Sequence, residues 1–472
     1  MQKNTKIVCT LGPSSDSISE IESLVNSGMD LARLNFSHGT YENHKKILDN
    51  LRTVEKRTGK TIGVIQDIQG PKIRVGTIPD PGIIIKRGEK IKLSITEEKV
   101  RKTKTEIIIP IQYKNIIKDT KKGDIILIDD GLLELIINNK NRNELICTVR
   151  IGGLVKSHKG VNVPTGSISA KAITEKDMED IKWGLKQNVD YIALSFVKSA
   201  KDIEELRDII KKNKKNTKII AKVERHEAIK NLEEIIKASD AVMVARGDLG
   251  IEIPAEMVPL IQKEMIKLSN KYQKPVITAT QVLQSMVENS RATRAEISDA
   301  ANAIFDHTDA IMLSNESAVG KYAQRAVKTL KDISITVEHE LQKHEHLMKW
   351  KDHEEYISEV SPICRSACQI AIESKAKLIA VYTESGFMAR EIAKNRLYIP
   401  IITITPNNYV KRELTLVWGL NKIIQHKIDN KQNKLDEIIN VLKKEKLIKT
   451  KDKIVIVYSS SIKEKLISTY IV

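Results

Sequence analysis

The sequence has few cysteines and no long apolar run. Its four cysteines are spread over 472 residues without a C-x-x-C motif, so neither a disulfide framework nor a zinc site is expected. Cys364 and Cys368 would share one helical face, where packing in a core is expected. No run of about 18 uncharged apolar residues occurs, and no basic segment followed by an apolar one opens the chain. We therefore expect a cytoplasmic protein with no membrane span and no signal peptide.

Aromatic residues are also scarce, at 4% of the chain, whereas the formal net charge is +17. A positive field attracts anions, which include nucleotides, phosphorylated metabolites and nucleic acids. Nucleic-acid binding is favoured by basic blocks interleaved with aromatics, but here the lysines are scattered over helix-like stretches. The charge therefore indicates a lysine-rich surface, and we expect no nucleic-acid partner.

Eight short runs rich in Val, Ile, Leu and Ala recur between Thr5 and Asn315, separated by amphipathic stretches typical of helices. Continuous apolar character is typical of parallel strands that are covered on both faces. Eight such strands alternating with helices predict a closed (β/α)8 barrel. The runs are TKIVCTL, LARLNF, IGVIQD, YIALSF, KIIAKV, AVMVAR, PVITAT and AIMLSN.

Two segments depart from this alternation. Strand-like runs punctuated by Gly, Asp and Asn predict an all-β domain, inserted after the third barrel strand, that can act as a lid. Near the C-terminus helix and strand patterns alternate again, but the strands are too few to close a barrel, so an open α/β sheet is predicted. The expected parts are the barrel (1–69 and 167–350), the lid domain (70–166) and the C-terminal α/β domain (351–472).

Barrel enzymes place their working residues at the carboxyl ends of the strands. In this sequence those ends carry cations that suit phosphate, carboxylates that suit a metal, and hydroxyl groups. They therefore predict a site for phosphate and a divalent metal. The residues are Arg33, Asn35, Ser37 and His38; Asp67, Lys72 and Arg74; Ser195; Lys222 and Glu224; Arg246, Gly247 and Asp248; Thr280 and Gln281; and Ser314 and Glu316.

The candidate metal ligands are two carboxylates from neighbouring strands. Glu224 lies two residues after Lys222 and so faces the same side, and Asp248 follows the next strand at a turn bracketed by glycines. Hard oxygen ligands suit Mg²⁺, or Mn²⁺ in its place, better than zinc. A salt bridge between Lys222 and Glu224 is the alternative interpretation, and the nearby Asp248 and Thr280 favour the metal site.

Nine motifs in order along nearly the whole chain resemble those of the pyruvate kinase family. They are KIVCTLGPSS, ARLNFSHG, KGVNVP, ITEKD, IAKVE, ARGDLG, ATQVLQSM, TRAEISDAANAIFD and MLSNES. The resemblance implies transfer of the phosphoryl group of phosphoenolpyruvate to ADP, the last step of glycolysis. It also implies a barrel with a β-rich lid and a regulatory C-terminal domain, in a cytoplasmic homotetramer.

The resemblance implies roles for the residues at the strand ends. Glu224 and Asp248 would hold the divalent metal, and Lys222 and Arg33 would act on the phosphoryl group. Thr280, or a water chain near Ser314 and Glu316, would protonate the enolate. The implied catalytic residues are Lys222, Arg33 and Thr280, the substrate-binding residues are Arg33, Lys222, Gly247, Asp248 and Thr280, and the nucleotide-binding residues are Arg74, Lys159, Asn35 and His38.

A monovalent-ion site is implied as well, but this chain departs from it. Many members of the family bind K⁺ through residues that match Asn35, Ser37, Asp67 and a threonine after that Asp, with a glutamate where this chain has Lys72. Here the threonine is replaced by Ile68, which offers no side-chain oxygen. An ammonium at Lys72 would also repel K⁺. We therefore expect Lys72, paired with Asp67, to replace the ion, so that Mg²⁺ alone is required.

The segment TESGFMAR resembles the family's loop for a sugar bisphosphate. Thr383, Ser385 and Gly386 are kept, but Glu384 adds a charge that repels phosphate. We therefore do not expect strong activation by fructose 1,6-bisphosphate. Another phosphorylated effector could use Arg390, Arg396 or nearby lysines.

Two rival functions stay open on the residues alone. A metal-dependent aldolase or lyase on a similar barrel would also carry Glu and Asp on adjacent strands, but it would not need a lid or Lys222. A non-catalytic protein that associates with RNA would keep only the fold, and the intact set of Lys222, Glu224, Asp248 and Thr280 argues against it.

Overall fold

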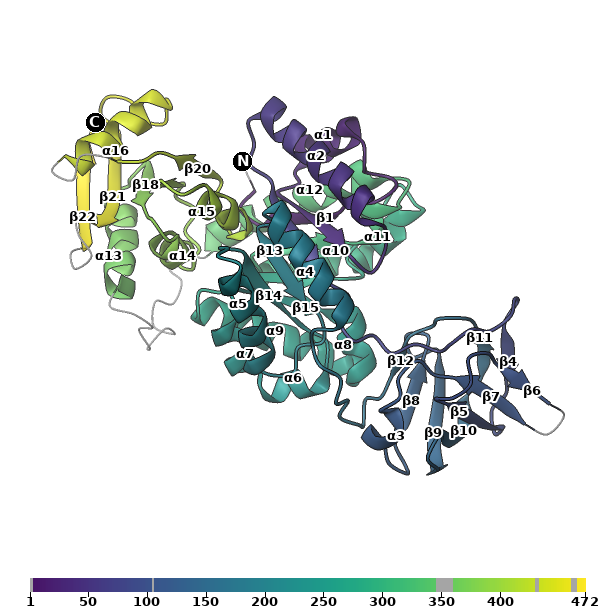
Figure 1. The fold of residues 1–472 in the computed structure, drawn as a ribbon. Helices are drawn as coiled ribbons and strands as arrows, with labels where there is room; N and C mark the ends of the chain where they lie inside the picture. The colour runs from purple at the N-terminus through teal and green to yellow at the C-terminus, as the bar shows by residue number, and fades with distance from the viewer. Residues whose placement is uncertain (1–2, 104–105, 345–359, 429–432, 460–464) are drawn as a thin grey trace.

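The computed structural model describes residues 3–103, 106–344, 360–428, 433–459 and 465–472. Figure 1 shows three parts, which are a central barrel, a β-rich part that projects from it, and a C-terminal α/β part on another side. The expected boundary between residues 350 and 351 lies outside the described residues. No helix in the described ranges is both long and apolar enough to span a membrane.

The eight predicted barrel strands form, and they close into a parallel barrel. The neighbours around it run β1, β17, β16, β15, β14, β13, β3, β2 and back to β1. In the register, Asn35 lies beside Asp67, so candidate residues from β2 and β3 meet at one rim. The strands are β1 (Lys6–Thr10), β2 (Leu31–Asn35), β3 (Gly63–Asp67), β13 (Tyr191–Leu194), β14 (Lys218–Val223), β15 (Ala241–Ala245), β16 (Val276–Ala279) and β17 (Ala310–Leu313).

Helices surround the barrel, and their ends follow sequence signals. Capping boxes at Ser17, Thr174 and Thr293 start three of them, because each hydroxyl accepts from a backbone amide of the first turn while the acidic residue three positions later bonds back. The helices are α1 (Ile18–Ser27), α2 (Tyr41–Thr58), α4 (Glu175–Gln187), α5 (Ala200–Lys212), α6 (His226–Lys230), α7 (Leu232–Ala238), α8 (Arg246–Glu252), η1 (Ala255–Met257), α9 (Val258–Lys271), η2 (Gln284–Val287), α10 (Arg294–Phe305), α11 (Asn315–Ala318) and α12 (Ala323–His344).

The segment after β3 forms a separate β domain, as predicted. Inward and outward side chains alternate along β9 and β10, so this domain has its own apolar core. A seven-stranded sheet has the order β12-β8-β9-β10-β5-β7-β6, and β11 pairs with β4. The elements are β4 (Ile83–Ile85), β5 (Lys90–Ser94), β6 (Arg101–Lys102), β7 (Ile107–Pro110), α3 (Ile116–Asp119), β8 (Ile125–Ile128), β9 (Leu133–Lys140), β10 (Glu144–Ile151), β11 (Gly153–Val155) and β12 (Val161–Asn162).

The C-terminal domain is an open sheet in the order β20-β19-β18-β21-β22, whose last strand is antiparallel to its neighbour. Cys364 and Cys368 are buried in its core as free thiols, as predicted. The elements are α13 (Val360–Glu373), β18 (Leu378–Tyr382), α14 (Phe387–Ala393), β19 (Ile401–Thr405), α15 (Asn408–Glu413), η4 (Leu414–Leu416), β20 (Lys422–Gln425), α16 (Lys434–Lys444), β21 (Lys453–Ser459) and β22 (Lys465–Ile471).

The C-terminal domain closes the base of the barrel, where the strands begin. Leu416 is fully buried in one cluster with barrel side chains such as Ile65 and Met243. Beside it, the Arg412 guanidinium bonds both carboxylate oxygens of Asp190, at 2.9 and 3.2 Å. Apolar packing and ion pairs therefore both hold the two domains together.

We predict that Leu416→Ala lowers the free energy of unfolding by about 2–5 kcal/mol, because it leaves a cavity at the base of the barrel. Urea denaturation measures the change. Leu260→Ala is the matched control, since that side chain is 59% exposed, and it should change stability little. Equal stability of the two variants would contradict the closing role of Leu416.

Candidate active site

At the carboxyl rim of the barrel, the Lys222 ammonium lies between two buried carboxylates. Its Nζ is 3.1 Å from Asp67 Oδ1 and 2.9 Å from Glu224 Oε1. It also donates to Ser195 Oγ at 2.7 Å. The carboxylate side chains are 2% exposed and Lys222 is 11% exposed. The Lys222–Glu224 salt bridge, which the sequence left as an alternative, is thus present.

Asp67 is compensated by two cations. Arg33 Nε donates to its Oδ2 at 2.7 Å, and Lys222 contacts its Oδ1. Burial acts to raise the pKa of Asp67, but the charges of Lys222 and Arg33 outweigh it and hold that pKa below its ordinary value. Asp67 is therefore ionised with both oxygens engaged.

Glu224 is in a different electrostatic environment. Burial raises its pKa to about 7, Lys222 opposes this, and the nearby Asp248 adds to the rise. The other Glu224 oxygen accepts the Phe196 backbone amide at 2.8 Å. For Lys222 burial favours the neutral amine, yet Asp67 and Glu224 together raise its pKa above the ordinary value. The Lys222 ammonium is therefore charged, whereas the negative charge of Glu224 is only partly balanced by the cations around it.

The expected pairing of Lys72 with Asp67 is wrong. Lys72 Nζ lies 3.9 Å from Asp248 Oδ1, and both oxygens of Asp67 are engaged by Arg33 and Lys222. The Lys72 ammonium therefore lies beside the neighbouring candidate metal ligand instead. Ile68 is fully buried, as its apolar side chain requires.

Thr280 follows directly after β16, in a strained conformation. Its φ is 65°, a left-handed value that is uncommon for a β-branched residue. Its Oγ1 accepts the Gly247 backbone amide at 2.8 Å. Arg246, a strand-end residue without a role assigned from the sequence, donates to the Thr280 carbonyl at 2.8 Å and to Asp299 at 2.7 Å. Arg246 therefore supports the turn that presents Thr280.

The side chain of Glu316 is held by hydrogen bonds to the backbone. Its two carboxylate oxygens accept the backbone amides of Leu283 and Ser314, at 3.0 and 2.8 Å, and the residue is fully buried. The carboxylate of Glu316 therefore holds the chain after β17 in place.

The expected nucleotide residues are divided between the barrel and the lid. Asn35 Oδ1 accepts the Ser37 amide at 3.2 Å, and the His38 carbonyl lies 3.0 Å from the ring of His44, so these residues belong to the rim after β2. In the lid, Arg74 donates to the His158 carbonyl at 2.8 Å. Lys159 Nζ is 2.8 Å from Asp129.

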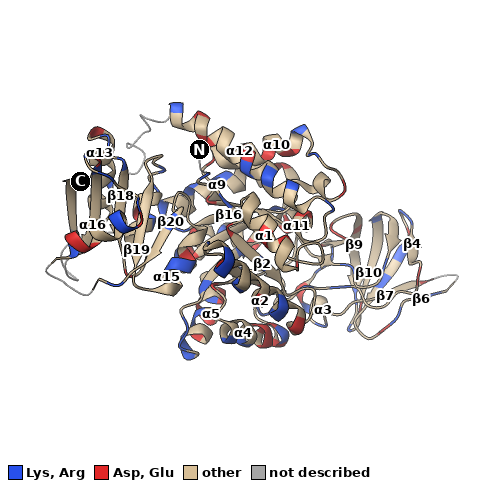
Figure 2. Cartoon of the chain, turned by 90° about the horizontal axis from the view of Figure 1, so that it is seen from above, with Lys and Arg blue, Asp and Glu red and all other residues tan. Residues whose placement is uncertain are grey.

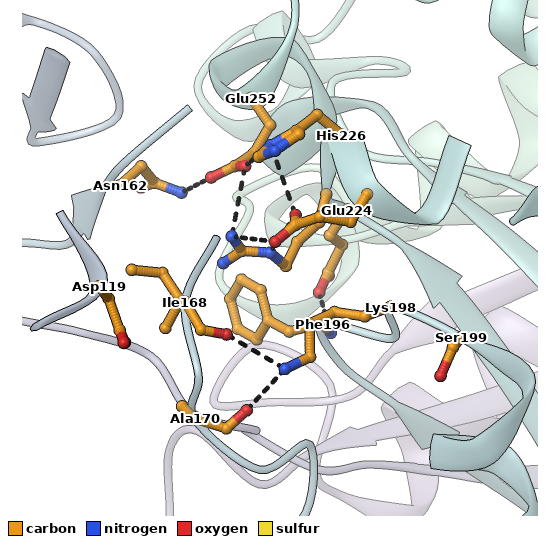
Figure 3. Close-up of polar contacts among 12 residues, drawn as sticks. Asp119, Asn162, Ile168, Ala170, Phe196, Lys198, Ser199, Glu224, His226 and Glu252 are labelled. Carbon is orange, nitrogen blue, oxygen red and sulfur yellow. Dashed lines mark hydrogen bonds and ion pairs between the residues drawn. The ribbon is translucent and has the colours of Figure 1, made fainter. Parts of the chain in front are cut away.

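Polar contacts connect the lid to the barrel beside this site (Figure 3). Asn162 of the lid donates to Glu252 at 2.9 Å, and Glu252 also contacts the His226 ring at 3.1 Å. The ligand atoms of His226, Glu227 and Glu252 lie close enough together to hold a metal ion. The Arg225 guanidinium already supplies a positive charge to this group, since its Nε lies 2.8 Å from Glu227. No sequence motif pointed to this cluster.

Comparisons with known proteins agree with this geometry. The family model described as pyruvate kinase, barrel domain, matches residues 2–327, and that described as pyruvate kinase, alpha/beta domain, matches residues 361–468. The chain belongs to the pyruvate kinase family. The predicted family and fold are confirmed, and the chain is an enzyme, a kinase of the pyruvate kinase type. Neither the aldolase or lyase nor the non-catalytic alternative is supported.

Individual relatives show how far the similarity to other pyruvate kinases extends. One from Staphylococcus epidermidis is 44% identical over 425 residues, which cover 90% of this chain and 72% of the relative. One from Staphylococcus aureus is equally similar. A crystal structure of a pyruvate kinase from Cryptosporidium parvum, 34% identical, matches with a TM-score of 0.91 and covers 100% of this chain and 96% of that one.

We predict that Asp67→Asn lowers the free energy of unfolding by about 3–5 kcal/mol, because it leaves two buried cations without their shared carboxylate. Denaturant titration gives the value. Asp49→Asn is the control, since its pair with Lys45 is exposed to solvent, and it should change stability little. A stable Asp67→Asn variant would show that the Asp67 charge is not needed to balance the site.

Proposed function

We propose that this enzyme transfers the phosphoryl group of phosphoenolpyruvate to ADP, giving pyruvate and ATP, with Mg²⁺ or Mn²⁺ as the metal. The observation that carries the proposal is the buried Lys222 ammonium beside Arg33 and two carboxylates at the barrel rim. Phosphoryl transfer passes through a loose transition state with charge spread over the equatorial oxygens, so positioned cations supply much of the catalysis.

Glu224 and Asp248 would hold the metal. The fit is supported by the raised pKa of Glu224, because a divalent cation would offset both the burial of that carboxylate and the nearby charge of Asp248. When bound, the metal would supply positive charge to the oxygens of the substrate. The exposed side of Asp248, 31% of its side chain, leaves room for water and substrate ligands.

The protein's own residues would then bind and orient the substrates. Lys222 and Arg33 would contact the phosphoryl oxygens, while Thr280 with the amides of Gly247 and Asp248 would bind the carboxylate. Thr280, or a water chain near Ser314 and Glu316, would protonate the enolate. For the nucleotide, contacts from the rim and from the lid would exclude water as the lid closes. They would come from Asn35, His38, Arg74 and Lys159.

The cellular setting belongs to the same proposal. As a pyruvate kinase the enzyme would act in glycolysis, in the cytoplasm, without a membrane or nucleic-acid partner. Figure 2 shows Lys and Arg spread over all three parts and interspersed with Asp and Glu, which supports a general basic surface over a nucleic-acid groove. We propose a homotetramer, as in the family, and a monomer in light-scattering measurements would contradict it.

We predict that the wild-type enzyme forms ATP from phosphoenolpyruvate and ADP in the presence of Mg²⁺, and that Lys222→Met lowers this rate by about 10²–10³-fold or more, because a cation is lost from a desolvated site. A coupled assay measures ATP. Lys230→Met, at an exposed lysine after the same strand, should keep full activity. Near-normal turnover of folded Lys222→Met, or no ATP from the wild type, would contradict the proposal.

We also predict that the enzyme needs no K⁺. Ile68 contributes no oxygen ligand, and the Lys72 ammonium, held near Asp248 instead of Asp67, still brings a fixed positive charge to this rim. Activity with Mg²⁺ in tetramethylammonium buffer should therefore be unchanged when K⁺ is added back. Lys72→Glu should lose activity in tetramethylammonium buffer and regain it with K⁺. A many-fold K⁺ activation of the wild type would refute the prediction.

A further inference from the structure

A second concentration of positive charge lies at the opposite end of the barrel, where the strands begin. A cavity of about 90 Å³ opens there between the barrel and the C-terminal domain. Two barrel lysines, Lys218 and Lys274, and Arg390 of α14 line it together with the carboxylates of Asp240 and Glu413. The cavity thus joins charged side chains from two domains.

The two carboxylates do not neutralise these cations. Glu413 is shared, with Oε1 at 2.7 Å from Arg390 and Oε2 at 3.3 Å from Lys218. Asp240 is already paired with Arg207 at 3.0 Å. Three cationic side chains therefore line the cavity with two carboxylates, and one of these carboxylates is shared with Arg207 outside the lining, which leaves a formal surplus of positive charge.

Lys274 carries the clearest part of this surplus. It donates to the Ser239 carbonyl, and none of the described carboxylates lies within ion-pair distance of it. Burial lowers its pKa to about 8, and the positive charges of Arg390, Arg207 and Lys218 act in the same direction, opposed by Asp240. A partly buried ammonium without a carboxylate is costly, and a bound anion would lower that cost.

We propose that this interdomain cavity binds phosphate, as the free ion or as the phosphoryl group of a small monoester. Fixed cations on several sides suit a compact oxyanion with several acceptor atoms. The cavity is far below the roughly 300–1,000 Å³ of sites for larger ligands, so a whole nucleotide does not fit. Arg396, the other arginine suggested by the sequence, is not among the residues that line this cavity, and it pairs with Asp309 at 3.1 Å.

The position of the cavity connects it to the active site. Tyr191 and Lys218, both in its wall, begin strands β13 and β14, whose other ends lead to Ser195 and to Lys222. Lys218 and Lys222 are four residues apart, which is about 13 Å along a strand. Phosphate held between Arg390 and the barrel lysines would tie the C-terminal domain to these strands. The site therefore suits an effector. This proposal does not depend on which substrates the active site binds.

Protection of Lys274 from acetylation tests the site in the wild-type enzyme. Acetic anhydride is applied at pH 8 with inorganic phosphate or with chloride at equal ionic strength, and mass spectrometry follows each lysine. An anion that raises the pKa of Lys274 by one unit from about 8 lowers its reactive amine fraction about fivefold. Lys267, exposed on α9, is the internal control. Equal Lys274 rates in phosphate and chloride would overturn the proposal.

Glycerol 2-phosphate distinguishes the two sources of the phosphoryl group. If phosphate protects Lys274, protection by this ester as well assigns a phosphomonoester, and its absence assigns the free ion.

A variant provides a second test that separates this cavity from the active site, where phosphate would also bind. Lys274→Met removes a charge that has no carboxylate partner, so the fold should be retained. Phosphate should raise the unfolding temperature of Lys274→Met less than that of the wild type and of Lys267→Met, because one of the two sites is lost. The same rise in all three proteins would contradict the cavity site, whatever the outcome of the ATP assay.

Discussion

The active-site rim depends on one buried ammonium shared by two carboxylates. Lys222 of β14 contacts Asp67, which ends β3, and Glu224, which follows β14. Neither carboxylate could stay ionised at 2% exposure without a cation beside it, since an unpaired buried charge costs several kcal/mol. Because β3, β13 and β14 are neighbours in the barrel, strands that are distant in sequence bring these groups together, and Ser195, which follows β13, completes the arrangement.

The two carboxylates differ in how much of their charge is balanced. Asp67 has two cations, Arg33 and Lys222, and a lowered pKa, so it serves to hold those cations in place. Glu224 shares Lys222 and faces Asp248, and its pKa is raised. A divalent cation therefore gains more from Glu224 and Asp248 than from Asp67. The Lys72 ammonium near Asp248 fits the same distribution, because it lies on the side where negative charge is in excess.

The strand-end residues and the barrel could be predicted because each leaves a local pattern. Eight apolar runs gave the strands, and the polar residue after each run gave the rim. The pairing of Lys72 could not be predicted, because the choice between Asp67 and Asp248 depends on the direction of the chain after Gly70. The charged cavity at the base was only partly foreseen: Arg390 was suggested for a phosphorylated effector, but Lys218 and Lys274 are ordinary surface residues in sequence and meet it only when the domains dock. The contact of Leu416 with the barrel could not be predicted either, because it forms only when the two domains dock.

The position of the metal tests this charge distribution most directly. Crystals of the wild-type enzyme grown with Mn²⁺ give an anomalous diffraction signal that locates the ion without reference to activity. The account predicts a peak in contact with the carboxylates of Glu224 and Asp248, while Asp67 keeps its contacts with Arg33 and Lys222. A peak coordinated by Asp67, or one confined to His226, Glu227 and Glu252, would contradict it.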